Sequence, residues 1–122
     1  MKKHMEYLMK YTGEGFFRDE EVLDWEAEDK DAESTYFFSY QGVEIGCISV
    51  FREPHRINLF NVYVEPEYRR RGFAAEMLFS VIEDLRDDGV TFVLQVSGDN
   101  EAAMRLYGKC GFAITESVEI TE

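Results

Sequence analysis

The segment Val62–Ala74 combines charge and backbone features that suit the binding of an anion. It reads V-Y-V-E-P-E-Y-R-R-R-G-F-A, an apolar strand followed by a basic turn and a helix. Three consecutive arginines occupy the turn, although the chain has a formal net charge of -12. Gly72 lacks a Cβ and allows close approach, while the helix from Ala74 directs unpaired N–H groups at the same place. The segment is therefore predicted to bind a pyrophosphate.

Two motifs of this sequence resemble those of the GNAT N-acetyltransferase superfamily. The first, R-x-x-G-x-A at residues 69–74, fits the signature R/Q-x-x-G-x-G/A and follows a V-x-P-E-Y lead-in that begins at Val64. The second begins at Asn100 and resembles N-x-x-A-x-x-L-Y-x-K-x-G-F, which ends here at Phe112. The resemblance covers residues 41–112, whereas the first forty residues match nothing clearly.

The resemblance implies transfer of an acetyl group from acetyl-CoA to a primary amine, by direct attack in a ternary complex. Members of the family hold acetyl-CoA in a V-shaped gap between two parallel strands, here Ile57–Val64 and Val90–Val96. A backbone N–H of the first strand would stabilise the oxyanion, and Tyr107, the implied catalytic residue, would protonate the departing thiolate. The implied acetyl-CoA contacts are Val62, Tyr63, Val64, Arg69, Arg70, Arg71, Gly72, Phe73, Ala74, Asn100 and Tyr107.

The residues at the usual positions of the general base differ from the family pattern. Two positions that often carry glutamate lie eleven residues before the signature arginine and five before the asparagine, and here they hold Asn58 and Gln95. Neither amide accepts a proton, and an alkyl amine with a pKa near about 10.4 is mostly protonated at pH 7. Other sources of a base are Glu53, His55, an acidic residue near positions 97–99, a water chain, or an acceptor that is already neutral.

Composition narrows the partners and the compartment. The 25 acidic and 13 basic residues argue against nucleic acid and favour a cationic acceptor, such as a polyamine, an aminoglycoside or a basic peptide or protein amine. No stretch approaches the roughly 18 apolar residues of a membrane span, and no signal peptide is evident, so the cytoplasm is expected. The spacing of Cys47, Cys110, His4 and His55 predicts no metal site.

A second interpretation is an acyl-CoA-binding regulatory module that is catalytically weak or inactive. The two amides favour it, whereas Tyr107 argues against it. A nucleotide site of the P-loop type is excluded, because neither G-x-x-x-x-G-K-[ST] nor G-x-G-x-x-G occurs. Acceptor choice is expected to depend on residues 1–34 and 52–56, whose neighbourhood contains aromatic residues that line an acceptor pocket or pack in the core: Phe16, Phe17, Trp25 and Tyr36.

The hydrophobic pattern predicts one α/β domain over residues 1–122, with a mixed sheet and one right-handed β-α-β crossover. Strands are predicted at Glu6–Tyr11, Thr35–Tyr40, Val43–Phe51, Ile57–Val64, Val90–Val96 and Phe112–Ile120. Helices are predicted at Arg18–Glu28, from Gly72 to a stop at Asp88-Gly89, and from the cap Asn100 to Gly111.

The chain is short for the implied GNAT-like fold. It has little room for the two helices that usually follow the first strand, and it stops short of the usual C-terminal pair of strands. An incomplete sheet leaves an exposed edge, and such edges are commonly covered by a partner chain. A homodimer is therefore predicted.

Overall fold

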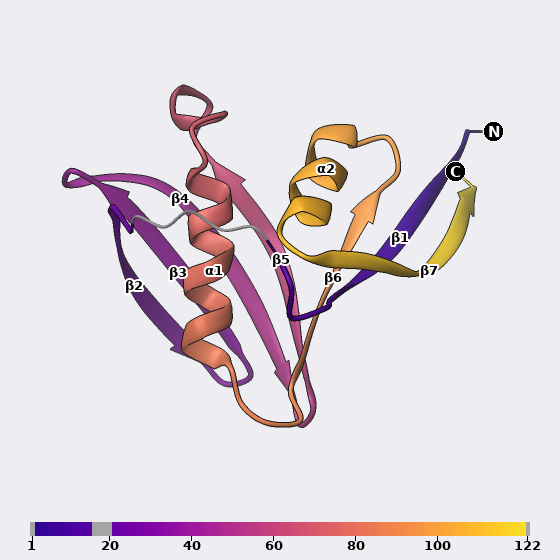
Figure 1. The fold of residues 1–122 in the computed structure, drawn as a ribbon, viewed down its shortest axis with the longest axis horizontal. Coiled ribbons are helices and arrows are strands. Elements are labelled where there is room, and N and C mark those ends of the chain that lie inside the picture. The colour runs from indigo at the N-terminus through magenta and orange to yellow at the C-terminus, as the bar shows by residue number, and fades with distance from the viewer. Residues whose placement is uncertain (1, 16–20, 122) are drawn as a thin grey trace.

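A computed structural model describes residues 2–15 and 21–121 and contains a seven-stranded sheet with two α-helices (Figure 1). The elements in chain order are β1 (Lys3–Tyr11), β2 (Leu23–Lys30), β3 (Glu33–Tyr40), β4 (Val43–Glu53), β5 (Arg56–Val64), the 3-10 turn η1 (Pro66–Tyr68), α1 (Phe73–Leu85), β6 (Thr91–Ser97), α2 (Glu101–Lys109) and β7 (Phe112–Thr121). The mixed α/β class predicted from the sequence is confirmed.

Strands β2 to β5 form an antiparallel meander whose turns follow from local sequence. Gln41 and Gly42, between β3 and β4, have φ values of 50° and 83°. Positive φ at both central residues is the geometry of a two-residue hairpin turn that matches the twist of its strands. The hairpin predicted at this dipeptide is therefore confirmed.

The helix predicted at Arg18–Glu28 is wrong over its described part. Residues 18–20 lie outside the described residues, and Leu23 onward belongs to β2, which pairs with β3 from Leu23–Tyr40 to Lys30–Glu33. One turn of apolar periodicity at Val22, Leu23 and Trp25 suggested a helix, but apolar residues alternate with acidic ones at 23, 25 and 27, which is the period of a strand. Pairing with β3 decides between the two.

The β5-α1-β6 unit forms the parallel centre of the sheet. Ile57 pairs with Phe92 and Leu59 with Leu94. Helix α1 begins after Gly72, whose φ is 82°, and ends at Leu85 rather than at the predicted stop. The predicted stop falls in the following turn. The buried side chains of α1 are Phe73, Glu76, Met77, Leu78, Val81 and Ile82.

The first strand lies inside the sheet rather than at its edge. The strand order is β2-β3-β4-β5-β6-β1-β7, and β1 is antiparallel to both of its neighbours. The strand beside β6 on this side is therefore β1, which comes from the start of the described chain. Strands β2 and β7 form the two outer edges of the sheet.

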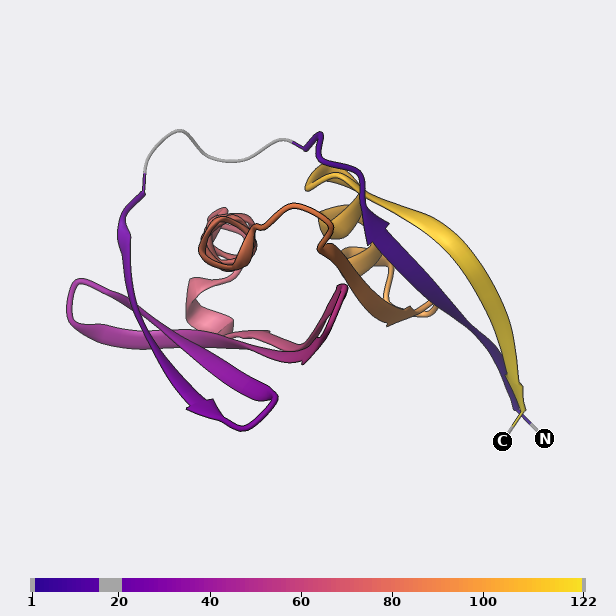
Figure 2. The ribbon, with the colours of Figure 1, turned by 90° about the horizontal axis from the view of Figure 1, so that it is seen from below.

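Both helices lie on one face of the sheet (Figure 2). Side chains of paired strands point to the same face, and Leu59, Leu94 and Met9 join the buried cluster beneath the helices. The residues that alternate with them point to the opposite face, which we call the helix-free face. Neither helix in the described part of the chain has the length and apolar character required to cross a membrane.

Candidate functional site

A V-shaped gap opens where β5 and β6 separate. Their backbone pairing ends at Leu59 and Leu94, although β5 continues to pair with β4 as far as Val64. The backbone of β5 beyond Leu59 consequently has a partner on its β4 side and none from β6. The unpaired side of a strand can accept an extended ligand as an added strand.

A bulge shapes the β5 side of this gap. Cys47 pairs with Tyr63 and Ser49 with Phe60, so β5 has one residue more than β4 between these pairs. Asn61, within the bulge, has a φ of 50°. A Cβ at Gly46 on β4 would collide with the carbonyl oxygen of Tyr63. Glycine at this position therefore allows the bulged strand to lie close against β4.

The turn after β5 adopts a strained backbone that suits anion binding. Arg70 has a φ of 62° and Gly72 a φ of 82°, both in the left-handed region. For a residue with a side chain this conformation is uncommon, and it occurs where surrounding structure imposes it. Turns of this kind group backbone N–H groups into a concave anion site, and the N-terminus of α1 adds further donors.

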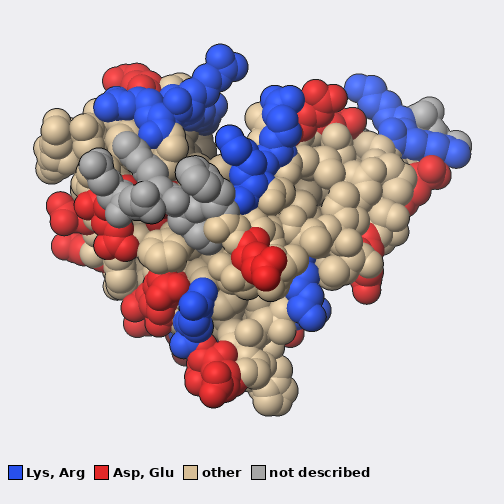
Figure 3. Space-filling model, in the orientation of Figure 1, with Lys and Arg blue, Asp and Glu red and all other residues tan. Residues whose placement is uncertain are grey.

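The three arginines of the turn have different surroundings. Arg69 donates from Nε to the carbonyl oxygen of Val64 at 2.7 Å. The guanidinium of Arg71 lies 5.3 Å from the ring centre of Tyr40 and 5.1 Å from that of Phe73. Basic side chains gather along the upper edge of the molecule on both sides of a notch between α1 and α2 (Figure 3).

Helix α2 forms the second wall. Asn100 accepts a hydrogen bond from the N–H of Ala103 at 3.1 Å, which caps the helix as its sequence predicts. Tyr107 is buried, with its ring edge-on to Phe112 at 6.1 Å. Burial, and to a smaller extent Cys110, raises the pKa of the Tyr107 phenol. The phenol therefore remains protonated at neutral pH.

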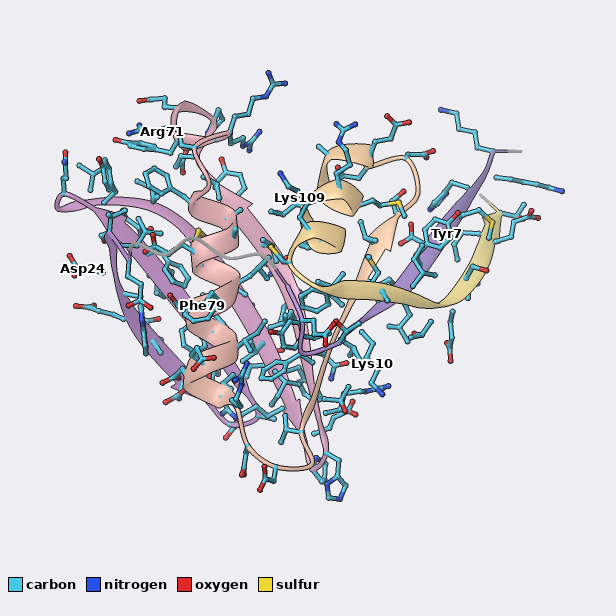
Figure 4. All side chains as sticks on the ribbon, in the orientation of Figure 1. Tyr7, Lys10, Asp24, Arg71, Phe79 and Lys109 are labelled. Carbon is cyan, nitrogen blue, oxygen red and sulfur yellow. The ribbon has the colours of Figure 1, made fainter. Side chains whose placement is uncertain are left out.

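Strand, turn and both helices enclose a cavity of about 600 Å³, a volume typical of sites for small molecules and cofactors. Except for Arg71, every residue predicted to contact acetyl-CoA lines it, and in Figure 4 the labelled Arg71 belongs to the turn before α1. Lining residues that the sequence did not single out as contacts are Tyr68, Ala75, Ala102, Ala103 and Leu106. Of these, Ala103 and Leu106 belong to the apolar stripe of α2, which the helical spacing of the sequence indicates.

The family profile described as "Acetyltransferase (GNAT) family" matches residues 2–112 of the chain. The chain belongs to this family. The resemblance inferred from the two motifs is thus confirmed.

Curated relatives match the motif-bearing part of this GNAT chain. The [ribosomal protein bS18]-alanine N-acetyltransferase of Escherichia coli is 42% identical over 55 residues, which are 44% of this chain and 37% of that protein. A mycothiol acetyltransferase of Nocardiopsis dassonvillei is 40% identical over 60 residues, which are 48% of this chain and 18% of that protein. The matched segments thus cover much less than two thirds of either relative.

Solved structures share the fold. A GNAT-family acetyltransferase from Novosphingobium aromaticivorans superposes with a TM-score of 0.76 at 20% identity, over 98% of this chain and 63% of that one. The ribosomal-protein-S18-alanine N-acetyltransferase of Escherichia coli gives a TM-score of 0.60 at 22% identity, over 77% and 73% of the respective chains. At these identities the likeness establishes the GNAT fold alone.

Two candidates for the general base lie at the wrong end of the sheet. Glu53 ends β4 and His55 lies in the turn before β5, where Arg56 pairs with Thr91 at the start of β6. The gap begins beyond Leu59, and strands rise about 3.3 Å per residue, so the end of β5 at Val64 is more than about 20 Å away. Both side chains therefore lie at the paired end of β5 and β6, away from the cavity at Val62 to Val64.

The two amides at the usual glutamate positions have defined partners. Asn58 donates from Nδ2 to the carbonyl oxygen of Phe51 at 3.3 Å, which ties it to β4. Gln95 is the first residue of β6 beyond the last β5–β6 pair, and its Nε2 donates to Glu6 Oε1 at 3.2 Å. Sequence reasoning missed Glu6, because the pairing of β1 with β6 cannot be read from either strand.

The four aromatic residues suggested for an acceptor pocket fall into two groups, two that the structure describes and two that it does not. Phe16 and Phe17 lie outside the described residues. Tyr36 is buried beneath α1 and donates its hydroxyl to Asp84 Oδ2 at 2.6 Å, while Trp25 stacks against it at 5.2 Å. Tyr36 therefore packs in the core, whereas Trp25 lies over it from β2 and remains 39% exposed. Among the residues that the structure describes, no three or more His, Cys, Asp or Glu are grouped to hold a metal ion.

Proposed function

We propose that this chain transfers an acetyl group from acetyl-CoA to a primary amine, by direct attack in a ternary complex. The observation that carries this proposal is the cavity of about 600 Å³. Its wall includes an unpaired strand edge, a left-handed basic turn at a helix N-terminus, and a buried protonated phenol. These parts suit a pantetheine arm, a pyrophosphate and a thiolate leaving group, respectively.

The fit to the pyrophosphate rests on the backbone of the turn. Its N–H groups and those at the start of α1 would donate to the phosphate oxygens, and Arg70, which lines the cavity, adds charge. Arg69 supports the site by holding the end of β5 through the Val64 carbonyl. Arg71 contributes its field from outside the cavity wall, over the aromatic rings beside the turn.

The pantetheine arm would lie along β5 at Val62 to Val64. The amides of the arm would pair with the backbone groups of this edge, where the Val64 carbonyl already accepts one hydrogen bond from Arg69. A strand N–H here would also stabilise the oxyanion that forms when the amine attacks the thioester. Phe73, Ala74 and the α2 cap Asn100 complete the contacts proposed for acetyl-CoA.

Tyr107 is the proposed general acid. It lines the cavity from α2, opposite the strand edge, and its pKa is raised by burial. A protonated phenol near the sulfur can give its proton to the thiolate as the C–S bond breaks, and positioned acids contribute about 10²–10⁴-fold.

A cationic acceptor is proposed from the charge of the helix-free face. Glu26, Glu28 and Glu33 point to this face by their register with β3 and β4, beside the exposed rings of Phe51 and Phe60. Such a surface would attract a polyamine, an aminoglycoside or a basic peptide or protein amine. The name of the Escherichia coli relative, an alanine N-acetyltransferase of a ribosomal protein, supports a protein amine among these.

The second candidate is an acyl-CoA-binding regulatory module with little or no turnover. The amides Asn58 and Gln95 favour it, because neither can deprotonate an amine. The retained Tyr107 argues against it. Release of CoA thiol by the wild-type protein with any amine would exclude the module.

The proposal also includes a cytoplasmic location and a homodimer. Both cysteines are free thiols in the structure, as in proteins of reducing compartments, and we place the activity in the cytoplasm. The outer edges β2 and β7 each present unpaired backbone, and we propose that a second copy covers one of them. Light scattering at micromolar concentration is expected to give the mass of a dimer, and a monomer mass would refute this assembly.

Calorimetric titration of acetyl-CoA into the purified protein is the first test of the function. We expect micromolar binding that Arg70→Gln weakens about tenfold, in proportion to the loss of one charge-assisted contact. Arg86→Gln is the matched control, because it removes the same charge at the far end of α1. An absence of binding by the wild-type protein would refute the proposed function.

A further inference from the structure

We infer that Glu6 of β1 is the general base of this chain and that Gln95 and His4 position its carboxylate. The inference rests on the proposed acetyl transfer, for which neither usual position supplies a carboxylate. It assigns the proton-accepting role to strand β1, which contains neither of the two family motifs.

The carboxylate of Glu6 is held at both oxygens. Gln95 Nε2 donates to Oε1 at 3.2 Å, and His4 Nε2 lies 3.2 Å from Oε2. The side chains of His4 and Glu6 are each 20% exposed, so the pair is sheltered without being sealed from solvent. Each carboxylate oxygen has two lone pairs, and the group can accept a further proton donor while it keeps both partners.

The register places this carboxylate beside the gap. Glu6 pairs with Ser97 and Leu8 with Gln95, whereas the intervening Tyr7 pairs with the core residue Val96. Glu6 and Gln95 therefore point to the helix-free face. Gln95 follows directly after Leu94, the last residue of β6 that pairs with β5, so the Glu6–Gln95 contact borders the opening between the strands.

The two faces of the gap then carry different groups. Tyr107 and the acetyl-CoA cavity belong to the helix-bearing face, while Glu6 and His4 belong to the opposite one. Beyond Leu59 and Leu94 no paired backbone separates these faces. A thioester in the gap would thus have its sulfur toward Tyr107, and an amine from the helix-free face would reach the carbonyl carbon past Glu6.

Access to the cluster is provided by a second hollow. It has a volume of about 490 Å³ and is lined by Lys2, Lys3, His4, Ser97 and Asp99. Two of its residues, His4 and Ser97, are respectively the partner and the cross-strand neighbour of Glu6. Water or a small acceptor can therefore approach the cluster from this side.

The proposed step balances its protons. The carboxylate of Glu6 takes one proton from the ammonium group, directly or through one water, and the neutral nitrogen attacks the thioester carbon. The C–N bond forms, the C–S bond breaks, and the sulfur takes the proton of the Tyr107 phenol. The amide nitrogen then loses its surplus proton and Glu6 loses the proton that it took. One of these protons restores the Tyr107 phenol and the other passes to solvent, which leaves an acetamide and CoA thiol.

Glu6→Gln tests the assignment with a side chain of the same size. We expect kcat for thiol release to fall about 10²-fold or more while acetyl-CoA binding and the thermal midpoint stay close to the wild-type values. Glu116→Gln is the matched control, because Glu116 is an exposed residue of β7 opposite Leu8 on the same face. It removes the same charge away from the gap and is expected to leave kcat unchanged.

A carboxylate swap separates catalysis from a merely structural role. In the double variant Glu6→Gln with Gln95→Glu, the same hydrogen-bonded pair is kept and the carboxylate moves to β6. We expect kcat to recover at least about tenfold over Glu6→Gln. An arylamine acceptor, which is neutral at pH 7, is expected to show a smaller deficit with Glu6→Gln than a polyamine does.

The outcomes distinguish this inference from the proposed function. Equal rates for Glu6→Gln, Glu116→Gln and the wild type would overturn the role of Glu6 and leave acetyl transfer intact. A deficit that the swap does not relieve would also overturn it, since the loss would then come from altered structure. Binding of acetyl-CoA with no thiol release to amines or water by the wild type would overturn both claims.

Discussion

The two walls of the gap are built in contrasting ways. One wall consists of β5, the basic turn and the start of α1, which are a single continuous segment of the chain. The other consists of β6, α2 and the inserted strand β1, and its Glu6–Gln95 hydrogen bond joins residues 89 positions apart. The first wall acts mostly through backbone groups and the second mostly through side chains. Binding and chemistry are thus assigned to different kinds of structure.

This contrast predicts that the first wall is less sensitive to side-chain substitution than the second. The backbone of the turn is fixed by a bulge, a glycine and a helix start, so its N–H groups persist whatever side chains surround them. Tyr107 and Glu6 have no such substitute. Substitutions in the second wall should therefore reduce the rate, whereas those in the first should reduce affinity or stability.

Tyr107→Phe in the catalytic wall is expected to have an effect as large as that of Glu6→Gln. Removal of the phenol proton should lower kcat for CoA-thiol release by about 10²-fold, while the ring keeps its packing against Phe112. Stopped-flow or steady-state thiol detection measures the rate, and calorimetry checks that acetyl-CoA still binds. A variant with the wild-type rate would exclude Tyr107 as the acid.

The alkaline limb of the rate profile gives a second prediction for the same residue. The acid acts only while protonated, so the rate falls as the pH rises through its pKa. Burial raises that pKa above the usual tyrosine value of about 10, and the fall is therefore expected above pH 10. The pH dependence of kcat should lose this limb in Tyr107→Phe, and a limb well below pH 10 would contradict the assignment.

Gly46→Ala tests the cofactor wall. The new Cβ would collide with the Tyr63 carbonyl oxygen and push the bulged end of β5 away from β4. Overpacking of this kind costs about 1–3 kcal/mol, and we expect both a lower thermal midpoint and weaker acetyl-CoA binding. Unchanged affinity in a folded variant would show that the bulge does not shape the site.

Glu76→Gln tests the attachment of β2 to this wall. The buried Glu76 carboxylate on α1 accepts hydrogen bonds from the N–H groups of Val22 and Leu23, the latter at 2.7 Å. An amide offers one acceptor oxygen in place of two, and we expect a loss of about 1–3 kcal/mol in the free energy of unfolding. Glu83→Gln, an exposed change on the same helix, should cost less than about 0.5 kcal/mol. Urea denaturation measures both, and equal effects would contradict the buried role.

The smallest effect is expected from Gly108→Ala on α2. An added Cβ there meets nothing within 4 Å, and the residue lies within a helix. Replacing an unconstrained helical glycine by alanine stabilises a protein by about 0.5–1 kcal/mol. A small rise in the thermal midpoint with unchanged kcat would show that glycine in α2 lacks the steric role it has at Gly46.

The sequence predicted the contiguous wall well, because every part of it is local. The strand, the arginine turn and the helix each follow from neighbouring residues, and all appear in the structure. The cap Asn100 of α2, in the other wall, is equally local and also appears. The errors lie where distant pairing decides. Leu23–Glu28 was expected within a helix and pairs instead with β3. A strand was expected at Glu6–Tyr11, but not its position between β6 and β7. The family motifs located Gln95, but only the register of β1 reveals its partner Glu6.

The insertion of β1 also determines when the site can form during synthesis. Strand β1 is synthesised well before its partners β6 and β7 and must wait for them, with contacts such as Thr115 to Leu8 spanning 107 positions. Pairings of such long range close late and slow the folding of a domain. The anion-binding turn can therefore form well before Glu6 reaches Gln95. On the proposed assignments, a nascent chain would therefore complete its anion-binding turn before it acquires its proton acceptor.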